Sequence, residues 1–281
     1  LIEALSRPIE VQGRRLRVGA SVGVVLCDGT GLGVDELLVQ SDAALYEAKA
    51  AGRGGFSFYS AELGERGRHR MDIEEGLRRA IDQGQLALHW QPKVDIAAWQ
   101  IVGAEGLMRW AHPVLGEVSP GEFIVIAEQC GLIDELGHWA LREACRTAAG
   151  PLAGMCLSVN VSPVQLRNGQ FVNQVRDALR EFHTEPACLE LEITESVFLD
   201  DVEGALEQLH ALRGLGVRIA LDDFGTGYSS LAYLRQFPFD TLKVDRTFVS
   251  EVLSRTDSRA IVQMIAQLAT TLGMRTVSEG V

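Results

Sequence analysis

From about residue 82 onward, short apolar runs alternate along the chain with longer amphipathic segments. The runs have the length and composition of buried strands, and turn residues bound them. The segments between them repeat apolar residues at the spacing of a helix that buries one face. Strands are predicted over 86–90, 101–105, 155–161, 189–193, 217–221, 241–244 and 275–278. Helices are predicted over 122–129, 134–148, 170–182, 202–212, 229–234 and 258–272.

Strands that alternate with helices of about ten to fifteen residues form right-handed βαβ units, so a parallel sheet is expected. Repeated this often, the pattern predicts an α/β fold of the (β/α)8 or TIM-like barrel type.

The start of the chain carries a separate α/β pattern, with strands predicted over 15–26 and 56–59 and a helix over 34–50. This piece is too short to bury a full core by itself. The charge-rich stretch 61–81 follows and predicts a solvated connecting helix. We therefore expect one domain over 1–60, a linker helix at 61–73 and a second domain over 74–281.

The 281-residue chain is 47% hydrophobic and 23% charged, as in an ordinary globular protein. No apolar run approaches the roughly 18 residues that span a bilayer. The five cysteines are scattered without zinc or disulfide spacing, which indicates reduced thiols and a cytoplasmic location, with any membrane anchor upstream. A net charge of -12 argues against a DNA or RNA polymer as partner. An anionic ligand would need a cation to mediate its binding.

Two adjacent carboxylates, Asp222 and Asp223, follow the strand predicted over 217–221. Successive strand residues point to opposite faces, so both can converge only where the strand gives way to loop. The glycines Gly225 and Gly227 allow a sharp turn there. Taken alone, this segment is better explained as an ordinary strand-to-loop turn.

Acidic and amide residues recur at the carboxyl ends of several predicted strands, the edge where barrels of this type carry their chemistry. Carboxylates so close together are unfavourable unless they are protonated or neutralised by a cation. Oxygen ligands without cysteine or histidine select Mg²⁺ or Mn²⁺, and two such ions ~3.5–4 Å apart suit in-line attack on a phosphate ester. The residues are five acids, Glu105, Glu192, Asp222, Asp223 and Glu279, the amide Asn160 and the lysine Lys243.

Each of these residues also has an ordinary structural explanation. Glu105 is a strand-end acid that can pair with Arg109. Asn160 can cap the helix that follows it. Lys243 can extend from its strand towards solvent, whereas an inward lysine among carboxylates would stay charged and orient water. Glu195 is expected to anchor a loop.

Seven short motifs follow one another between about residue 74 and the end: QPKV (91–94), EGLMRW (105–110), SVNVS (158–162), LELEITES (189–196), DDFGTGYSS (222–230), LKVD (242–245) and SEGV (278–281). In this order they resemble the EAL-domain phosphodiesterases that hydrolyse cyclic di-GMP. The family's signature alanine is Gly106 here, a change that we expect to loosen the backbone slightly with little effect on chemistry.

The resemblance implies metal-dependent hydrolysis of cyclic di-GMP to linear pGpG, with two Mg²⁺ or Mn²⁺ ions per site. Gln91 and Arg109 would contact the substrate. One ion would be held by Glu105, Asn160, Glu192 and Asp222. Asp222 would also bind a second ion, which Asp223 would hold.

The resemblance also implies roles around the reacting water. Lys243 and Glu279 would position or deprotonate it. Glu195 would brace the loop 223–230, which in this family couples metal binding to dimerisation. A homodimer through the EAL domain is therefore implied.

Residues 1–60 resemble the C-terminal part of a GGDEF (diguanylate cyclase-like) domain, through ASVGV (20–24), SDAALYEAK (41–49) and GRG (52–54). The signature loop of that domain would precede residue 1, so the resemblance assigns no cyclase activity to this chain. A sensory domain further upstream is expected. Past residue 281 the EAL family continues with a further acid, a final strand and its helix. The barrel is therefore expected to be incomplete before its last strand and to expose two edges.

Two alternatives remain open. The first is a catalytically inactive module that binds cyclic di-GMP as an effector or regulator; such modules usually lose metal ligands, and none is missing here. The second is a fragment that does not fold by itself, against which a cooperative unfolding transition would count.

Overall fold

The computed structural model describes residues 2–6, 8–11, 14–27, 33–52, 54–167, 169–198, 201–225, 234 and 236–280. The chain divides into two compact units, Leu1–Glu75 and Gly76–Val281. Helix α3 (Ala61–Ala80), predicted from its charge density as a connecting helix, contributes to both.

In the first unit, α2 (Val34–Ala50) packs against a parallel pair of short strands, β3 (Val22–Val24) and β4 (Phe56–Phe58). Its face towards the strands carries Ala44 and Ala48, which are buried. The predicted helix is thus confirmed, and its small residues let it lie close to the strand pair.

The single strand predicted over 15–26 is wrong. Its first residues belong to β2 (Arg14–Leu16), which pairs antiparallel with β1 (Ile9–Val11). The short helix α1 (Ile2–Leu5) precedes both strands in the chain. Its later residues form β3, in a different sheet. The alternation of apolar residues indicates which face of a strand each side chain takes. It does not indicate where the chain leaves one partner strand and pairs with another.

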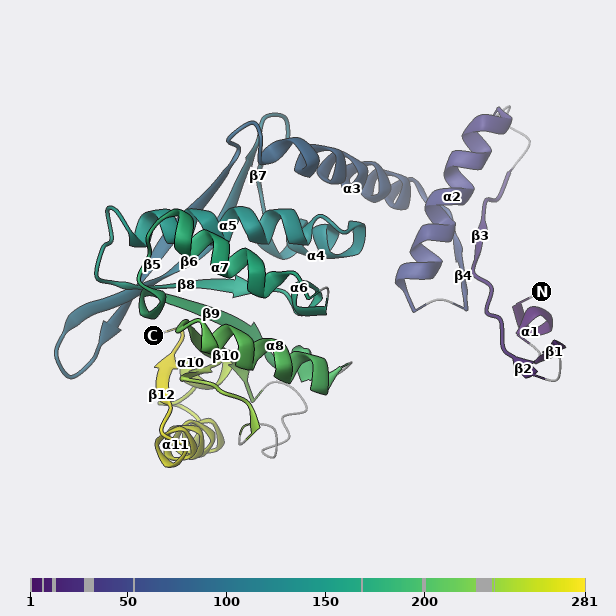
Figure 1. The fold of residues 1–281 in the computed structure, drawn as a ribbon. Helices are drawn as coiled ribbons and strands as arrows, with labels where there is room; N and C mark the ends of the chain where they lie inside the picture. The colour runs from purple at the N-terminus through teal and green to yellow at the C-terminus, as the bar shows by residue number, and fades with distance from the viewer. Residues whose placement is uncertain are drawn as a thin grey trace. The chain divides into compact units, whose positions relative to one another are not determined.

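One curved sheet organises the second unit (Figure 1). Its strand order is β12-β11-β10-β9-β8-β6-β5, and β7 (Gly116–Val118) pairs with β6. The run from β6 through β8 to β12 is parallel. The main strands are β5 (Leu86–Asp95), β6 (Gln100–His112), β8 (Cys156–Val161), β9 (Leu189–Thr194), β10 (Arg218–Phe224), β11 (Thr241–Val244) and β12 (Arg275–Ser278).

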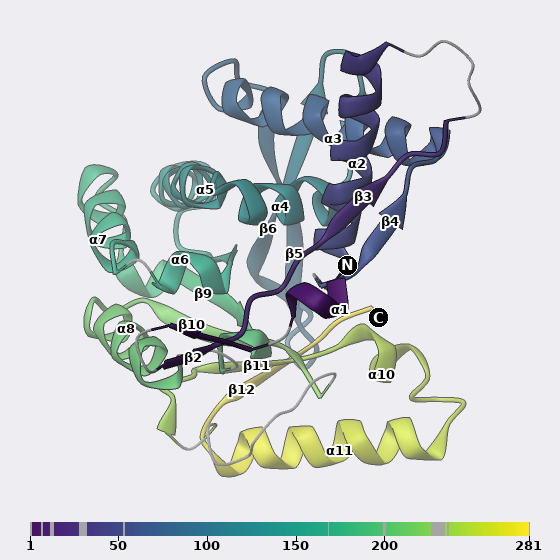
Figure 2. The ribbon, with the colours of Figure 1, turned by 90° about the vertical axis from the view of Figure 1, so that its right-hand side faces the viewer.

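Helices cover the outer face of this sheet. Figure 1 shows α5, α7 and α8 side by side on it, and Figure 2 shows α11 running along β11 and β12. The helix predicted over 229–234 lies almost entirely outside the described residues. The helices are α4 (Pro120–Cys130), α5 (Ile133–Ala148), α6 (Pro163–Arg167), α7 (Phe171–Glu181), α8 (Val202–Gly214), α10 (Arg246–Ser250) and α11 (Thr256–Thr271), with 3₁₀ helices η1 (Pro186–Cys188) and η2 (Glu195–Phe198).

The α/β, TIM-like class is confirmed, but the prediction of a wholly parallel sheet is wrong at its start. Strand β5 runs antiparallel to β6, because the short connection between them cannot form the crossover of about a dozen residues that a parallel pair needs. Within the described part of the chain, no strand pairs with the outer edge of β5 or β12. The sheet is therefore curled like part of a barrel and not closed.

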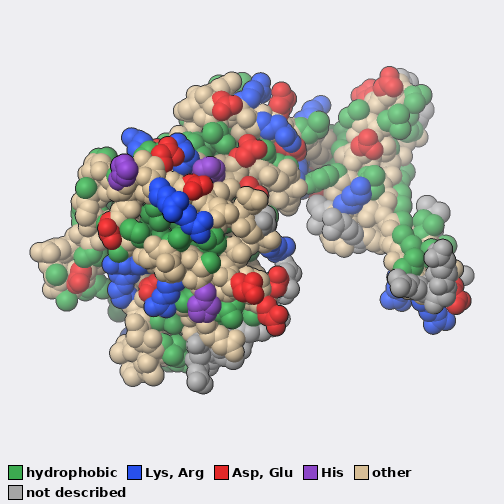
Figure 3. All heavy atoms as spheres, in the orientation of Figure 1, with side chains coloured by type: hydrophobic (Ala, Val, Ile, Leu, Met, Phe, Trp, Pro, Cys, Tyr) green, Lys and Arg blue, Asp and Glu red, His purple; other side chains and the backbone are tan. Residues whose placement is uncertain are grey.

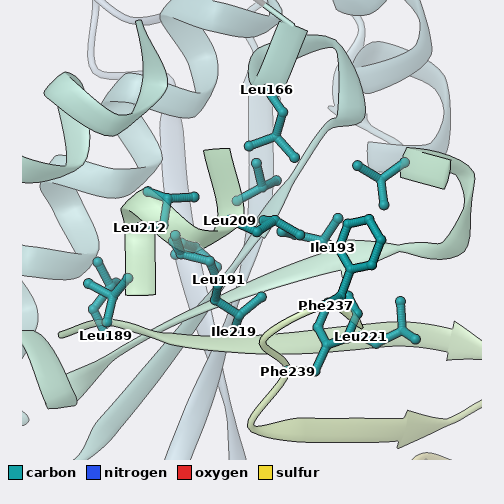
Figure 4. Packing of buried hydrophobic residues seen from close by; sticks show 14 of the residues in the cluster. Leu166, Leu189, Leu191, Ile193, Leu209, Leu212, Ile219, Leu221, Phe237 and Phe239 are labelled. Atoms are coloured by element: carbon teal, nitrogen blue, oxygen red, sulfur yellow. The ribbon is translucent and has the colours of Figure 1, made fainter. Parts of the chain in front are cut away.

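Alternate residues of the central strands separate the core from the inner face. In β9, Leu189, Leu191 and Ile193 point outwards and pack against the helices, including α8 (Figure 4). The residues between them, Glu190 and Glu192, are equally buried but point to the inner face. The helices thus hold the strands from outside, and polar side chains line the inside.

None of the helices in the described ranges combines the length and the apolar character that crossing a bilayer requires. On the face shown in Figure 3, acidic and basic side chains are interspersed over the second unit. This face therefore presents no continuous basic surface to a nucleic acid polymer.

Gly106, at the family's signature alanine position, lies against Trp90. A Cβ atom at residue 106 would lie 2.9 Å from Cζ3 and 3.1 Å from Cη2 of Trp90, so the ring fills the space of the missing methyl. We expect Gly106→Ala to destabilise the protein by about 1–3 kcal/mol through overpacking, as measured by urea unfolding. Gly214→Ala is the control, because a Cβ there meets nothing within 4 Å. Equal stability of the two variants would contradict the prediction.

Candidate active site

The carboxylates of Asp222 and Asp223 converge at a bulge in β10. The register between β10 and β11 shifts between Leu221 and Phe224, so β10 carries one residue more than its partner. Asp223 has a φ of 54°, and its amide donates to Asp222 Oδ1 at 2.9 Å. The expectation that the strand ends before these residues is wrong, because the bulge turns the second carboxylate back within the strand.

The amine of Lys243, on β11, gathers four carboxylates on the inner face. Its Nζ lies 3.2 Å from Glu105 Oε2 and 3.0 Å from Asp222 Oδ2. It also lies 2.7 Å from Glu279 Oε1 and contacts Glu192 Oε2. Since Lys243 is only 1% exposed, it does not extend into solvent. Acids from β6, β9, β10 and the end of β12 therefore meet at one atom.

Asn160 belongs to the same group. Its Nδ2 donates to Glu105 Oε1 at 2.9 Å, which links β8 to β6. The alternative role as a helix cap falls to Ser162, whose Oγ accepts the amide of Val164 at 3.2 Å. The structure thus places Asn160 among the carboxylates.

Glu195 reaches the site from η2, directly after β9. Its Oε1 accepts the amide of Gly225 at 2.9 Å. Gly225 has a φ of 101°, which favours glycine. Glu195 therefore holds the backbone directly after the bulge. Of the loop 223–230 that Glu195 is predicted to brace, residues 226–230 lie outside the described residues.

The two predicted substrate contacts take different positions. Gln91 is exposed and pairs across β5 and β6 with Glu105, so it stands beside the carboxylates. Arg109 is half-buried further along β6, and its Nη1 donates to the carbonyl of Met108 at 2.9 Å. Glu105 pairs with Lys243 and not with Arg109, which removes the strand-end pair as an explanation.

Residues 74–281 match the family model of the EAL domain. The chain belongs to the EAL-domain family. Residues 1–55 match the model described as the diguanylate cyclase, GGDEF domain, so this resemblance is confirmed as well.

Relatives of this EAL domain act on cyclic di-GMP. The whole chain is 40% identical to the bifunctional diguanylate cyclase/cyclic di-GMP phosphodiesterase MucR of Pseudomonas aeruginosa, of which it covers 42%. It is also 40% identical to the cyclic di-GMP phosphodiesterase NbdA of that organism, of which it covers 36%. The chain thus spans less than half of the length of these curated relatives.

A solved structure, the PaMucR phosphodiesterase in complex with c-di-GMP, is similar at a TM-score of 0.71 and 43% identity, over 74% of this chain and 86% of that one. Together the relatives place the EAL domain in a cyclic di-GMP phosphodiesterase family.

Burial, together with the crowding of acids, determines the electrostatics of the EAL site. Burial raises the pKa of Asp222 above its ordinary value, and Glu192 and Glu279 add to this against the opposing charge of Lys243. Burial and Asp222 raise the pKa of Asp223 as well. Burial alone would lower the pKa of Lys243, but the surrounding carboxylates outweigh it, so its pKa is raised and it stays protonated. The carboxylates of Glu105, Glu192, Asp222, Asp223 and Glu279 lie along one edge of the sheet, called the rim below. One lysine therefore leaves negative charge at the rim uncompensated.

The residues of the EAL site fit hard divalent cations, on which EAL domains generally depend. Oxygen atoms of Asp222, Asp223 and Glu279 lie within 4.8 Å of one another. This is close to the ~4.2 Å between opposite oxygen ligands of one Mg²⁺ ion. The donors are carboxylates and one amide, which suit Mg²⁺ or Mn²⁺. Burial first, and neighbouring carboxylates second, raise the pKa of both aspartates, and a bound cation would oppose both effects.

Sequence reasoning assigned no role to a second layer of charge below the rim. There Lys93, on β5, contacts Glu190 and Glu192, and Ser158 on β8 completes the group. The sequence does contain an indication of this layer, because Glu190 and Glu192 lie two residues apart in one strand and therefore point to the same face. Two acids on one buried face predict a cation between them.

Proposed function

We propose that this EAL domain hydrolyses cyclic di-GMP to linear pGpG with two Mg²⁺ or Mn²⁺ ions. The observation that carries the proposal is the meeting of four carboxylates from separate strands at Lys243 Nζ. A relative at 43% identity has been solved in complex with c-di-GMP, which supports the choice of substrate.

The proposed ligands divide between two ions. Bound ions would act as Lewis acids on the phosphate and lower the pKa of water. The bulge in β10 brings the carboxylate of Asp223 to that of Asp222, so the two could serve neighbouring ions. One ion would be held by Glu105, Asn160, Glu192 and Asp222, and the second by Asp223 together with Asp222.

The remaining residues would handle water and substrate. Lys243 is protonated, so it orients the water and cannot accept its proton. Glu279, which Lys243 holds at 2.7 Å and whose side chain is 30% exposed, is the proposed acceptor. The water oxygen adds to phosphorus, one P–O3′ bond breaks, and the 3′ oxygen takes up a proton. Gln91 and Arg109 are the proposed substrate contacts, and Glu195 is the proposed brace of the loop 223–230, through the amide of Gly225.

The test is conversion of cyclic di-GMP to pGpG by the full-length protein with Mg²⁺ or Mn²⁺, against Asp222→Ala. We expect turnover by the wild type and at least about 10²-fold less by the variant, since a Lewis-acid ion supplies several kcal/mol. Wild-type turnover no higher than that of the variant rejects the proposal. Micromolar binding of cyclic di-GMP without turnover would support the inactive effector module instead.

For the full-length protein we also propose a homodimer through the EAL domain, located in the cytoplasm and joined to an upstream sensory domain. The brace from Glu195 to Gly225 supports a coupling between the loop 223–230 and the metal site. Sedimentation analysis of the full-length protein tests the oligomeric state, and a monomer at micromolar concentration rejects the homodimer.

A further inference from the structure

The side chain of Lys93 lies across the inner face between β5 and β9. Its Nζ is 2.6 Å from Glu192 Oε1 and 2.9 Å from Glu190 Oε1, and it also contacts Ser158 Oγ. The side chains of Glu192 and Lys93 are 0% and 13% exposed. Lys93 is therefore a largely buried cation between two acids of one strand.

Glu192 divides its two oxygens between two lysines. Oε2 contacts Lys243, which meets the other carboxylates of the rim. Oε1 contacts Lys93, on the side of Glu190. One oxygen is therefore directed to the candidate metal site, and the other is held below it.

Glu190 fixes the position of Lys93. Its Oε1 accepts the hydroxyl of Ser158 at 2.9 Å, and its Oε2 accepts Thr241 Oγ1 at 2.8 Å and Arg275 Nη2 at 3.1 Å. Residues from β8, β11 and β12 thus hold Glu190, and Glu190 holds Lys93.

We propose that Lys93 is a positioning residue that holds Glu192 by Oε1, so that Glu192 offers only Oε2 to a divalent ion. The inference rests on the metal site of the proposed function. A carboxylate held in this way is a monodentate ligand, which suits the octahedral coordination of Mg²⁺, whereas Ca²⁺ accepts bidentate carboxylates and more ligands. Lys93 would therefore favour Mg²⁺ and Mn²⁺ over Ca²⁺.

A purely structural role for Lys93, as the counter-charge of Glu190, makes a different prediction. Lys93→Met removes the amine and keeps most of the stem, which takes one cation away from the two buried acids Glu190 and Glu192. Lys93→Met combined with Glu190→Gln removes one charge of each sign and keeps the net charge. A counter-charge role requires the double variant to recover both stability and metal affinity.

The measurements are calorimetric titration with Mn²⁺, Mg²⁺ and Ca²⁺, and thermal unfolding without metal, all on the full-length protein. We expect the double variant to recover most of the melting temperature that Lys93→Met loses. We expect its affinity for Mn²⁺ to stay about 10-fold or more below that of the wild type, as for other residues that orient a metal ligand. Its preference for Mn²⁺ over Ca²⁺ should fall as well.

Two controls keep the test decisive. Glu190→Gln alone retains Lys93 and should bind Mn²⁺ within about threefold of the wild type, well below the loss expected for an orienting residue. Lys93→Arg retains a donor to Oε1 and should bind Mn²⁺ more tightly than Lys93→Met. If the double variant does not fold, this second comparison decides, and equal affinities overturn the inference.

The inference is overturned if the double variant binds Mn²⁺ as tightly as the wild-type protein does. It is also overturned if the wild-type protein binds no Mn²⁺. A wild type that binds Mn²⁺ without hydrolysing cyclic di-GMP overturns the proposed function alone, because the metal titrations contain no substrate.

Discussion

Replacing Lys243 by methionine is expected to slow hydrolysis strongly and to destabilise the metal-free protein by about 3–5 kcal/mol, the cost of breaking a buried ion pair from one side. Lys243 is 1% exposed and Glu192 is 0% exposed, so water cannot replace the lost charge. Added Mn²⁺ is expected to recover much of the stability, because the ion meets the same carboxylates. It is not expected to recover activity, because the ion does not take over the orientation of the attacking water.

The pH dependence of this defect follows from the raised pKa of Lys243. A lysine of this kind contributes its full stability below its unfolded pKa of about 10.4 and loses it as the pH rises through the folded value. The contribution is therefore complete at neutral pH, and the defect of the variant should be constant from about pH 7 to pH 9. Below that range it should shrink, because the acids left without Lys243 can then protonate.

Urea unfolding with and without Mn²⁺, together with turnover assays, measures these effects. Lys49→Met is the matched control, since Lys49 is exposed on α2, and its stability should change by less than about 0.5 kcal/mol. Turnover by Lys243→Met should fall by about 10²-fold or more, because the attacking water loses the cation that orients it. A metal-free Lys243→Met as stable as the wild type would contradict the expectation.

Much of the fold could be predicted because its signals are local. The helix predicted over 34–50 and the strands predicted over 241–244 and 275–278 are α2, β11 and β12 with the same bounds. The meeting of Glu105, Glu192 and Asp222 at one rim also followed from general rules, because the ends of parallel strands share one edge of a sheet.

The features that could not be predicted depend on pairing between distant segments. The antiparallel direction of β5 is set by its short connection to β6, and the convergence of the aspartates by a register shift against β11. The contact between Lys93 and Glu192 joins residues 99 positions apart, and no local pattern places one opposite the other. The alternation of side chains along a strand shows only which face of the sheet each residue takes.

Asp223→Asn is expected to stabilise the metal-free protein and yet to lower hydrolysis by about 10²-fold, because a lost ion ligand removes part of the Lewis-acid contribution. Burial, together with the charge of Asp222, raises the pKa of Asp223 above its ordinary value of 3.8, so its ionised form is unfavourable in the metal-free fold. Asparagine removes that charge. It also tolerates the φ of 54° at this position better than most residues, so the backbone of the bulge should persist.

Stability and metal affinity should therefore respond to pH with opposite signs. Between the ordinary and the raised pKa of Asp222 and Asp223, the folded protein binds more protons than the unfolded chain, so metal-free stability falls as the pH rises. The gain of Asp223→Asn should appear across that window and vanish at more acidic pH. Affinity for Mn²⁺ should rise through the same window, since the ion requires ionised carboxylates.

Thermal unfolding without metal at several pH values, with calorimetric titration of Mn²⁺, tests this pair of trends. Asp82→Asn is a suitable control, because Asp82 lies in the exposed turn after α3, away from the rim. It should change neither the melting temperature nor the affinity for Mn²⁺ appreciably. If Asp223→Asn lowered metal-free stability at neutral pH, Asp223 would be paired favourably in the fold without an ion. The rim would then not be built for a cation at a cost to its own stability.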